Sequence, residues 1–380
     1  MRHRKWFLAP LALLLAAALP AGADDLVYAG TFTNNNNGSR GIYVYRFQPA
    51  NGKVKPLGVA AETANPSFLV TDATHRFLYA VNENSGPGVL GSVSAFSIDH
   101  KTGKLTLLNW VSSRGGGPCH LALDRTGRWL AVANYATGSI AVIPVHADGR
   151  LGEAVAFRQH EGKSVNPARQ QGPHAHCVLF SPDNRFLLVA DLGLDKILVY
   201  RFDASNGSIA PNKPAFAGVK PGSGVRHLVF HPNGKVLYAI SEMGNSISAY
   251  NYYAQSGTLD EFQTIGTLTE SFHGASTAAE IAINQAGTVL YASNRGDNSI
   301  AEYAVDPTKF TLTLADHFPT LGKTPRHFAL DPSGSWLFAA NQDSNDIVVF
   351  KVYARTGQLT PDGTVLKDAP SPVCILFVPE

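Results

Sequence analysis

The sequence predicts an all-β fold, a seven-bladed β-propeller with four antiparallel strands in each blade, on three observations. A strand–turn–strand pattern recurs along the chain, the composition is typical of strands and turns, and the two ends supply complementary strands. The 380 residues include 20 Phe, 13 Tyr and 35 Gly but only two Met, and this composition favours sheets over helices.

The repeat is a pair of apolar runs joined by a tight turn, as in GVRHLVFHPNGKVLYAISEM at 224–243. The same pattern returns at 66–83, 118–135, 175–192, 278–295 and 325–342. Between these pairs lie a third run and a Gly-containing turn, such as SISAYNYYAQSGTL, so each unit supplies four strands. Equivalent positions are 47 to 57 residues apart, a spacing that fits propeller blades.

The two ends of the chain complete the seventh blade. The C-terminal run SPVCILFV at 371–378 is half a repeat, and its partners are the N-terminal runs at 26–32 and 41–47. A blade shared in this way closes the ring and leaves no exposed strand edge. We therefore expect residues 24–380 to form a single propeller domain without a linker.

Residues 1–23 have the pattern of a secretory signal peptide. The basic start MRHRK is followed by the apolar run WFLAPLALLLAAAL and the small residues Ala21, Gly22 and Ala23, which predicts cleavage after Ala23. The alternative is a membrane anchor, but the run is shorter than the roughly 20 apolar residues of a spanning helix. We expect a periplasmic or secreted protein that is not attached to a membrane after cleavage.

Charge and cysteine content limit the classes of partner. A formal net charge of +2 gives no basic surplus, so we expect no nucleic-acid partner, and we expect a monomer. Cys119, Cys177 and Cys374 are odd in number, match no zinc-site spacing and lie in apolar runs. We expect them to be buried free thiols.

Two positions in each repeat are predicted to meet at one rim of the central channel. One precedes the first strand and the other ends the second strand 16 residues later, and in an antiparallel pair these positions lie at the same edge. The early position holds Ser67, Cys119, His176, Arg226, Ala279, Arg326 and Val373. The late position holds Glu83, Tyr135, Leu192, Glu242, Arg295 and Gln342. So many charged residues at equivalent positions indicate a pocket for a small anionic or oxygen-rich ligand. The alternative is that they are solvated charges that pair with one another.

The position after the early one holds His120, Cys177, His227, Glu280 and His327. Strand alternation predicts that these side chains face the other side of the strand, where the histidines pack or form hydrogen bonds between blades. We keep Glu280 as a candidate pocket residue. His174 and His176 in PHAH make only two candidate metal ligands, and no phosphate-loop or dinucleotide motif is present. We therefore expect neither a metal nor a cofactor.

Hydrolysis or elimination next to a carbonyl is the chemistry that suits these residues. Glu242 or His176 could take a proton from water, and Arg226 or Arg295 could stabilise an oxyanion. Arg326 could hold a carboxylate or phosphate through paired hydrogen bonds. The remaining candidates for substrate binding are Gln342, Glu83 and Glu280.

Several of these segments resemble the seven-bladed lactonase propeller family, which includes the bacterial propeller-type 6-phosphogluconolactonase and the fungal 3-carboxymuconate lactonizing enzyme. The segments are PHAHCVLFSPDNRFLLVADLG, GSGVRHLVFHPNGKVLYAISEM, AAEIAINQAGTVLYASNRGDNSIAEY and TPRHFALDPSGSWLFAANQDSNDIVVF. The resemblance covers essentially the whole mature chain. It implies a small-molecule lactone substrate and a metal-independent site that here comprises His176, Arg226, Glu242 and Arg295.

Three functions are consistent with this sequence. The first is an exported lactonase that opens a cyclic sugar ester, with either a phosphorylated or an unphosphorylated substrate. The second is a lactonizing enzyme of the muconate type, and the third is a propeller that binds partners without catalysis. The joint presence of Glu242, His176, Arg226 and Arg295 favours an enzyme.

Overall fold

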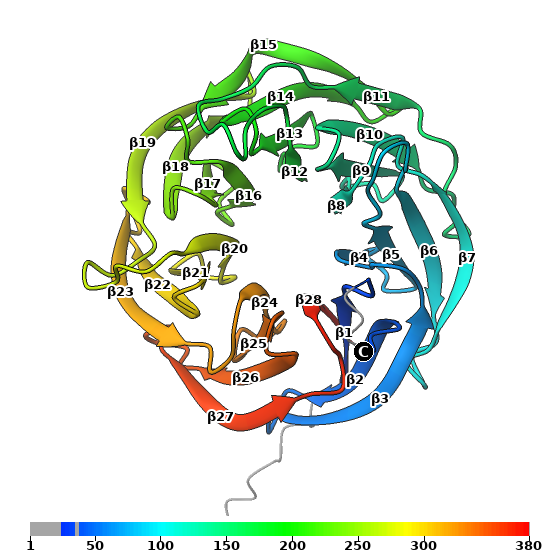
Figure 1. Ribbon diagram of the computed structural model, residues 1–380, viewed down its shortest axis with the longest axis vertical. Helices are drawn as coiled ribbons and strands as arrows, with labels where there is room; N and C mark the ends of the chain where they lie inside the picture. Colours follow the sequence, from blue (N-terminus) through cyan, green and yellow to red (C-terminus); the bar gives the residue numbers. More distant parts are fainter. Residues whose placement is uncertain (1–23, 35–37, 380) are drawn as a thin grey trace, which may run out of the picture.

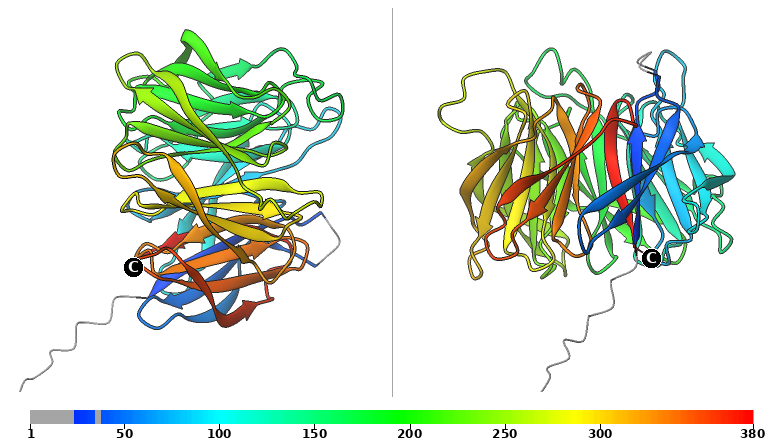
Figure 2. Two further views of the ribbon diagram at one scale, coloured as in Figure 1. Left: turned by 90° about the vertical axis from the view of Figure 1, so that its left-hand side faces the viewer. Right: turned by 90° about the horizontal axis from the view of Figure 1, so that it is seen from below.

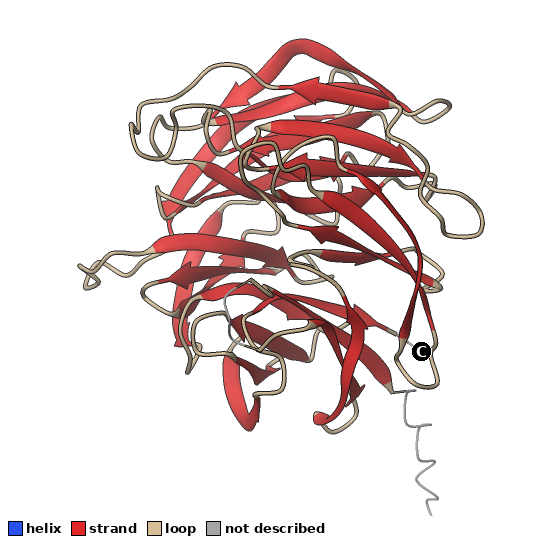
Figure 3. Cartoon of the chain, turned by 45° about the vertical axis from the view of Figure 1, so that its right-hand side comes forward, coloured by secondary structure: helices blue, strands red, loops and turns tan. Residues whose placement is uncertain are grey.

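The computed structural model describes residues 24–34 and 38–379, and the predicted signal peptide at 1–23 lies outside them. Seven four-stranded antiparallel sheets surround a central axis, which confirms the predicted propeller (Figure 1). Figure 3 shows this part of the chain as strands and loops. Among the residues described, no helix has the length and apolar character needed to cross a membrane.

Blade 1 is shared by the two ends of the chain, as predicted. Its strands, from the axis outward, are β28 (Pro372–Val378), β1 (Asp25–Thr31), β2 (Gly41–Gln48) and β3 (Lys53–Glu62). β28 is antiparallel to β1, with Leu26 opposite Val378 and Thr31 opposite Pro372. The two strands lie side by side in Figure 1, one red and one blue.

The other six blades each use four consecutive strands, the first nearest the axis and the last at the outer edge (Figure 1). Blade 2 comprises β4 (Leu69–Thr71), β5 (Phe77–Asn82), β6 (Ser92–Ile98) and β7 (Leu105–Ser112), and blade 3 comprises β8 (Pro118–Leu123), β9 (Trp129–Asn134), β10 (Ser139–Pro144) and β11 (Ala156–Gln159). Blade 4 comprises β12 (Ala175–Phe180), β13 (Phe186–Asp191), β14 (Lys196–Asp203) and β15 (Ser208–Gly218), and blade 5 comprises β16 (Val225–Phe230), β17 (Val236–Ser241), β18 (Ser246–Tyr253) and β19 (Thr258–Gly266). Blade 6 comprises β20 (Thr277–Ile283), β21 (Val289–Arg295), β22 (Ser299–Val305) and β23 (Leu312–Pro319), and blade 7 comprises β24 (Pro325–Leu330), β25 (Trp336–Asn341), β26 (Asp346–Val352) and β27 (Leu359–Leu366).

The hydrophobic core consists of the layers between neighbouring blades. Seen from the side, the sheets stand roughly along the axis with their faces against one another (Figure 2). At the junction of blades 7 and 1, Phe338 packs edge-on against Phe47 and Phe377, with ring centroids 5.2 and 5.1 Å apart. Because both faces of a middle strand are covered, β17 and β25 are buried along their whole length. This explains why their sequences are continuous apolar runs.

A second contact between blades joins a tryptophan to the outer turn of the next blade. The Trp336 indole N–H of blade 7 donates to the Pro49 carbonyl of blade 1 at 2.9 Å. Gly52 in the same turn has φ +76°, and a Cβ there would lie 2.2 Å from the Trp336 ring. Trp129 of blade 3 repeats this contact with Ala204 and Gly207 of blade 4. Glycine is therefore required in these turns both by the backbone conformation and by the ring that covers it.

We expect Trp336→Ala to lower the free energy of unfolding by about 3–5 kcal/mol, because it removes a buried indole at the closing junction. Trp336→Phe keeps most of the packing and loses only the hydrogen bond to Pro49, so a loss of about 1 kcal/mol is expected. Chemical denaturation followed by circular dichroism measures both changes. Equal losses in the two variants would contradict the packing role.

Candidate active site

A polar cavity of about 350 Å³ lies where the blades meet at the axis. Its lining residues are Phe32, Glu83, Cys119, Tyr135, Arg169, His176, Glu242, Thr277, Arg295 and Arg326. A smaller space shares several of these residues and adds Ser67, Phe68, Arg226, His227, Glu280, His327 and Val373. Glu280 and six other predicted site residues thus line these two spaces. Gln342, which directly follows β25, is not among their lining residues.

A β-bulge at the start of the innermost strands explains which side chains reach the axis. In β16, Val225 is opposite Ser241 and His227 is opposite Ile240, so Arg226 is an extra residue. The same shift leaves Arg326 unpaired in β24. An extra residue interrupts strand alternation, so that two successive side chains can point the same way.

The predicted orientation of His227 and His327 was therefore wrong, because both line the smaller space, and the candidate pocket residue Glu280 lines it with them. His227 Nδ1 and His327 Nε2 lie 3.0 and 3.4 Å from Glu280 Oε2. The expected hydrogen bonds between blades are nevertheless present, because the Ile375 amide of blade 1 donates to His327 Nδ1 at 3.2 Å. Phe68 packs against the rings of both histidines, at 5.9 and 5.7 Å.

Three arginines surround Glu242, which directly follows β17. Arg169 Nη2 lies 2.8 Å from Oε1, while Arg226 Nε and Arg295 Nη2 lie 3.2 and 2.8 Å from Oε2. Burial alone would raise the pKa of this carboxyl, but the charges of Arg295, Arg226 and Arg169 outweigh it and lower the pKa to about 2. Glu242 is therefore an ionised carboxylate at neutral pH, and both of its oxygens are occupied by arginines.

The arginines are fixed in turn by backbone carbonyls. Arg226 Nη1 donates to Ala279 O at 2.7 Å, and Arg295 Nη2 donates to Ala278 O at 3.1 Å. Burial and the neighbouring arginines lower the pKa of Arg226 to about 10, so it remains charged at neutral pH. Its side chain is only 3% exposed, against 14% for Arg295, so Arg295 is the more accessible of the two to a ligand.

His176 lies beside this cluster as a neutral imidazole. Burial, followed by the charge of Arg226, lowers the pKa of His176 well below 6.5. Its Nδ1 atom is buried and has no hydrogen-bond partner among the described residues. The ring packs edge-on against Tyr135 and His227, with centroids 5.5 and 5.1 Å away.

A second carboxylate, Glu83, follows β5 in blade 2. Ser67 Oγ donates a hydrogen bond to Glu83 Oε2. Burial raises the pKa of Glu83, and the charge of Arg326 and the Ser67 hydrogen bond oppose that rise. The Arg326 guanidinium lies over the Phe32 ring, 5.2 Å from its centroid.

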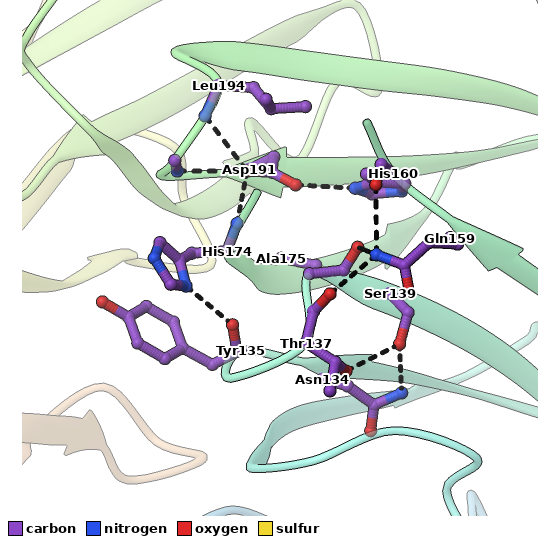
Figure 4. Close-up of polar contacts among 12 residues, drawn as sticks. Asn134, Tyr135, Thr137, Ser139, Gln159, His160, His174, Ala175, Asp191 and Leu194 are labelled. Atoms are coloured by element: carbon purple, nitrogen blue, oxygen red, sulfur yellow. Dashed lines mark hydrogen bonds and ion pairs between the residues drawn. The ribbon is translucent and has the colours of Figure 1, made fainter. Parts of the chain in front are cut away.

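Arg169 was missed from the sequence because it lies outside the repeat, in the loop 160–174 between blades 3 and 4. The unusually long spacing of 57 residues between Cys119 and His176 was the available signal. The loop is held at its start by His160 Nδ1, which lies 2.6 Å from Asp191 Oδ2, with both side chains buried (Figure 4). Near its end, Gln170 donates to Leu192 O at 2.8 Å. This anchoring places Arg169 at the cavity.

Tyr135 joins this loop to the cavity. His174 Nδ1 donates to the Tyr135 carbonyl at 2.9 Å, and the two rings stack with centroids 4.6 Å apart (Figure 4). The Tyr135 hydroxyl accepts a hydrogen bond from Arg169 Nη2 at 3.0 Å. His174 thus has a structural role, because its ring packs against Tyr135, the side chain that orients Arg169.

The three cysteines are free and buried, as predicted. Cys119 lines the cavity, but burial raises the pKa of its thiol well above 9. It is therefore protonated at neutral pH and is not an activated nucleophile.

The fold and this cavity define a class of protein, a β-propeller with a positively charged axial pocket for a small oxygen-rich molecule. The family described as "Lactonase, 7-bladed beta-propeller" matches residues 26–377, and the chain belongs to this family of lactonases.

Relatives and solved structures agree with this assignment. The chain is 32% identical to a 6-phosphogluconolactonase of Bacillus subtilis (strain 168), over 92% of this chain and 97% of the relative. A putative 6-phosphogluconolactonase from Bacteroides fragilis superposes with a TM-score of 0.87 at 37% identity, covering 95% of this chain and 99% of the other. A periplasmic gluconolactonase of Pseudomonas aeruginosa superposes with a TM-score of 0.87 at 35% identity, covering 94% and 99%.

We expect Glu242→Gln to change the pH dependence of stability. A carboxyl whose pKa falls from 4.5 to about 2 on folding stabilises the folded state above pH 4.5, and this contribution is lost as the pH falls towards 2. The difference in unfolding free energy between wild type and variant should therefore narrow by about 2–3 kcal/mol from pH 6 to pH 2.5.

Urea unfolding at the two pH values measures this difference. The exposed Glu153, changed to Gln, is the matched control. A gap between wild type and Glu242→Gln that is the same at both pH values would contradict the ion-pair assignment.

Proposed function

We propose that this protein is an exported, metal-independent lactonase that adds water to the ring ester of a sugar-acid lactone. The observation that carries the proposal is the set of arginines around the ionised Glu242. Arg169, Arg226, Arg295 and Arg326 line the two adjoining spaces, which hold only three carboxyl groups. Guanidinium groups fixed in a partly buried site favour the negative charge that develops on the carbonyl oxygen.

The roles follow from the exposure of each group. Arg295 lines the main cavity and is the candidate to stabilise the oxyanion, whereas the more deeply buried Arg226 holds Glu242 in place. Arg326 and Arg169 are the candidates to bind a carboxylate or phosphate of the substrate. His176 stays neutral and can exchange hydrogen bonds with the sugar.

The substrate class is supported by the relatives. Two of them, from Bacillus subtilis and Formosa agariphila, are named 6-phosphogluconolactonases, and the Pseudomonas aeruginosa neighbour is named a periplasmic gluconolactonase. A cavity of about 350 Å³ is in the range of small-molecule sites. Glucono-δ-lactone and its 6-phosphate are therefore the substrates to compare.

We expect the purified mature protein to accelerate proton release from at least one of these lactones above the spontaneous rate. Glu242→Gln should reduce kcat/KM by at least about 100-fold, because the arginines lose the anion that arranges them. The measurement is a pH-indicator assay with an enzyme-free blank, and Glu153→Gln should retain the wild-type rate. No acceleration with either lactone would overturn the proposed activity.

Export is proposed from the residues at 1–23, and the periplasmic neighbour supports it. When the full-length gene is expressed in a bacterial host, the protein recovered from the periplasmic fraction should begin at Asp24. Intact-mass spectrometry of that fraction measures the cleavage site. A protein that keeps Met1 and stays in the cytoplasmic fraction would contradict export.

A further inference from the structure

Water addition to an ester needs a group that accepts a proton from the attacking water. Glu242 is badly placed for this, because arginines occupy both of its oxygens at 2.8 to 3.2 Å. A carboxylate with a pKa of about 2 is also a poor base, and so is the His176 imidazole, whose pKa lies well below 6.5. The buried thiol of Cys119 and the Tyr135 hydroxyl have raised pKa values and remain protonated at neutral pH.

Glu83 follows β5 of blade 2, whereas Glu242 follows β17 of blade 5, and these two blades lie on different sides of the ring (Figure 1). It lines both the main cavity and the smaller space beside it. Its Oε2 atom accepts the Ser67 hydrogen bond, and among the described residues no hydrogen bond is made to Oε1. The cavity thus contains arginines fixed around Glu242 and, near Arg326, a second carboxylate whose Oε1 accepts no hydrogen bond from the described residues.

We infer that Glu83 is the general base of the reaction, and that Glu242 is a positioning residue that holds the arginines. This inference rests on the proposed lactonase function. Glu83 Oε1 is the atom that takes the proton, and the Ser67 hydroxyl fixes the orientation of the carboxylate. Burial supports the role, because it raises the pKa of Glu83 and makes its ionised form a stronger base.

The step balances without another reactant. Glu83 removes one proton from water as the water oxygen bonds to the lactone carbonyl carbon, and the carbonyl electron pair becomes an oxyanion facing Arg295. The intermediate then breaks the bond between carbon and ring oxygen, and the proton on Glu83 passes to that oxygen. The products are a hydroxy acid, which releases the measured proton, and the regenerated carboxylate.

Glu83→Gln should reduce kcat by about 10²- to 10⁴-fold, because the amide cannot accept the proton. Glu83→Asp keeps a carboxylate and should be at least about tenfold more active than Glu83→Gln. Calorimetry with gluconate, the hydrolysis product, separates catalysis from binding and shows that the site is folded. Gluconate affinity should stay within a factor of about three of wild type in Glu83→Gln, since a base contributes mainly to kcat.

A pH profile gives a second, independent readout. The charges of Arg326 from blade 7 and Arg226 from blade 5 act on Glu83, and Ser67 of its own blade donates a hydrogen bond to it. The protonated Cys119 of blade 3 lines the same cavity. The Ser67 hydrogen bond lowers the pKa of Glu83, so Ser67→Ala should raise it. Because activity requires ionised Glu83, the acidic limb of kcat should move to higher pH in Ser67→Ala.

Each outcome decides the inference. A Glu83→Gln variant with kcat within about threefold of wild type overturns it, as does a loss of activity matched by an equal loss of gluconate affinity. A pH profile of kcat whose acidic limb is the same in Ser67→Ala as in wild type also overturns the inference. If wild type itself shows no rate above the blank, the proposed function falls together with this inference. If wild type is active and Glu83→Gln is equally active, only the inference falls.

Discussion

The antiparallel pairing of β28 with β1 closes the ring, and the geometry of the axis depends on that closure. Without it, blades 1 and 7 would separate at the Phe338 junction and at the contact of Trp336 with the blade 1 turn. Residues from blades 2, 5 and 6 meet in one cavity of about 350 Å³. Closure of the ring therefore also fixes the distances between the side chains that line this cavity. A site composed of single side chains from many blades is only as well ordered as the ring that holds them.

Within that ring, a β-bulge that recurs in several blades allows different side chains to reach the axis. The bulge at the start of the innermost strand brings two successive side chains to the axis, as it does with Arg226 and His227. Each blade keeps the antiparallel pairing of four strands, so the residues at the bulge can differ without altering the fold. Charged residues that would be costly elsewhere in the interior are tolerated there because they pair with one another and with backbone carbonyls.

The repeat made most of the fold and much of the candidate site predictable. Strand pairs recur at nearly constant spacing, and aligning them is enough to place Arg226, Glu242 and Arg326 at one rim. Simple alternation failed at His227 and Glu280, because a bulge adds a residue that no periodic pattern shows. Arg169 was missed since it lies in a loop without a counterpart in other blades. Gln342 holds an equivalent position but is not among the lining residues.

The loop 160–174 is fastened to blade 4 through Asp191 and Leu192, and to blade 3 through the Tyr135 carbonyl. It contributes Arg169 to the cavity, and its anchors are independent of the β28–β1 closure. Such a segment can change in length and sequence over evolution while the ring stays intact. Under the proposed function, one substrate-binding residue is thus encoded outside the repeat, and a designer who wished to alter selectivity would exchange this loop first.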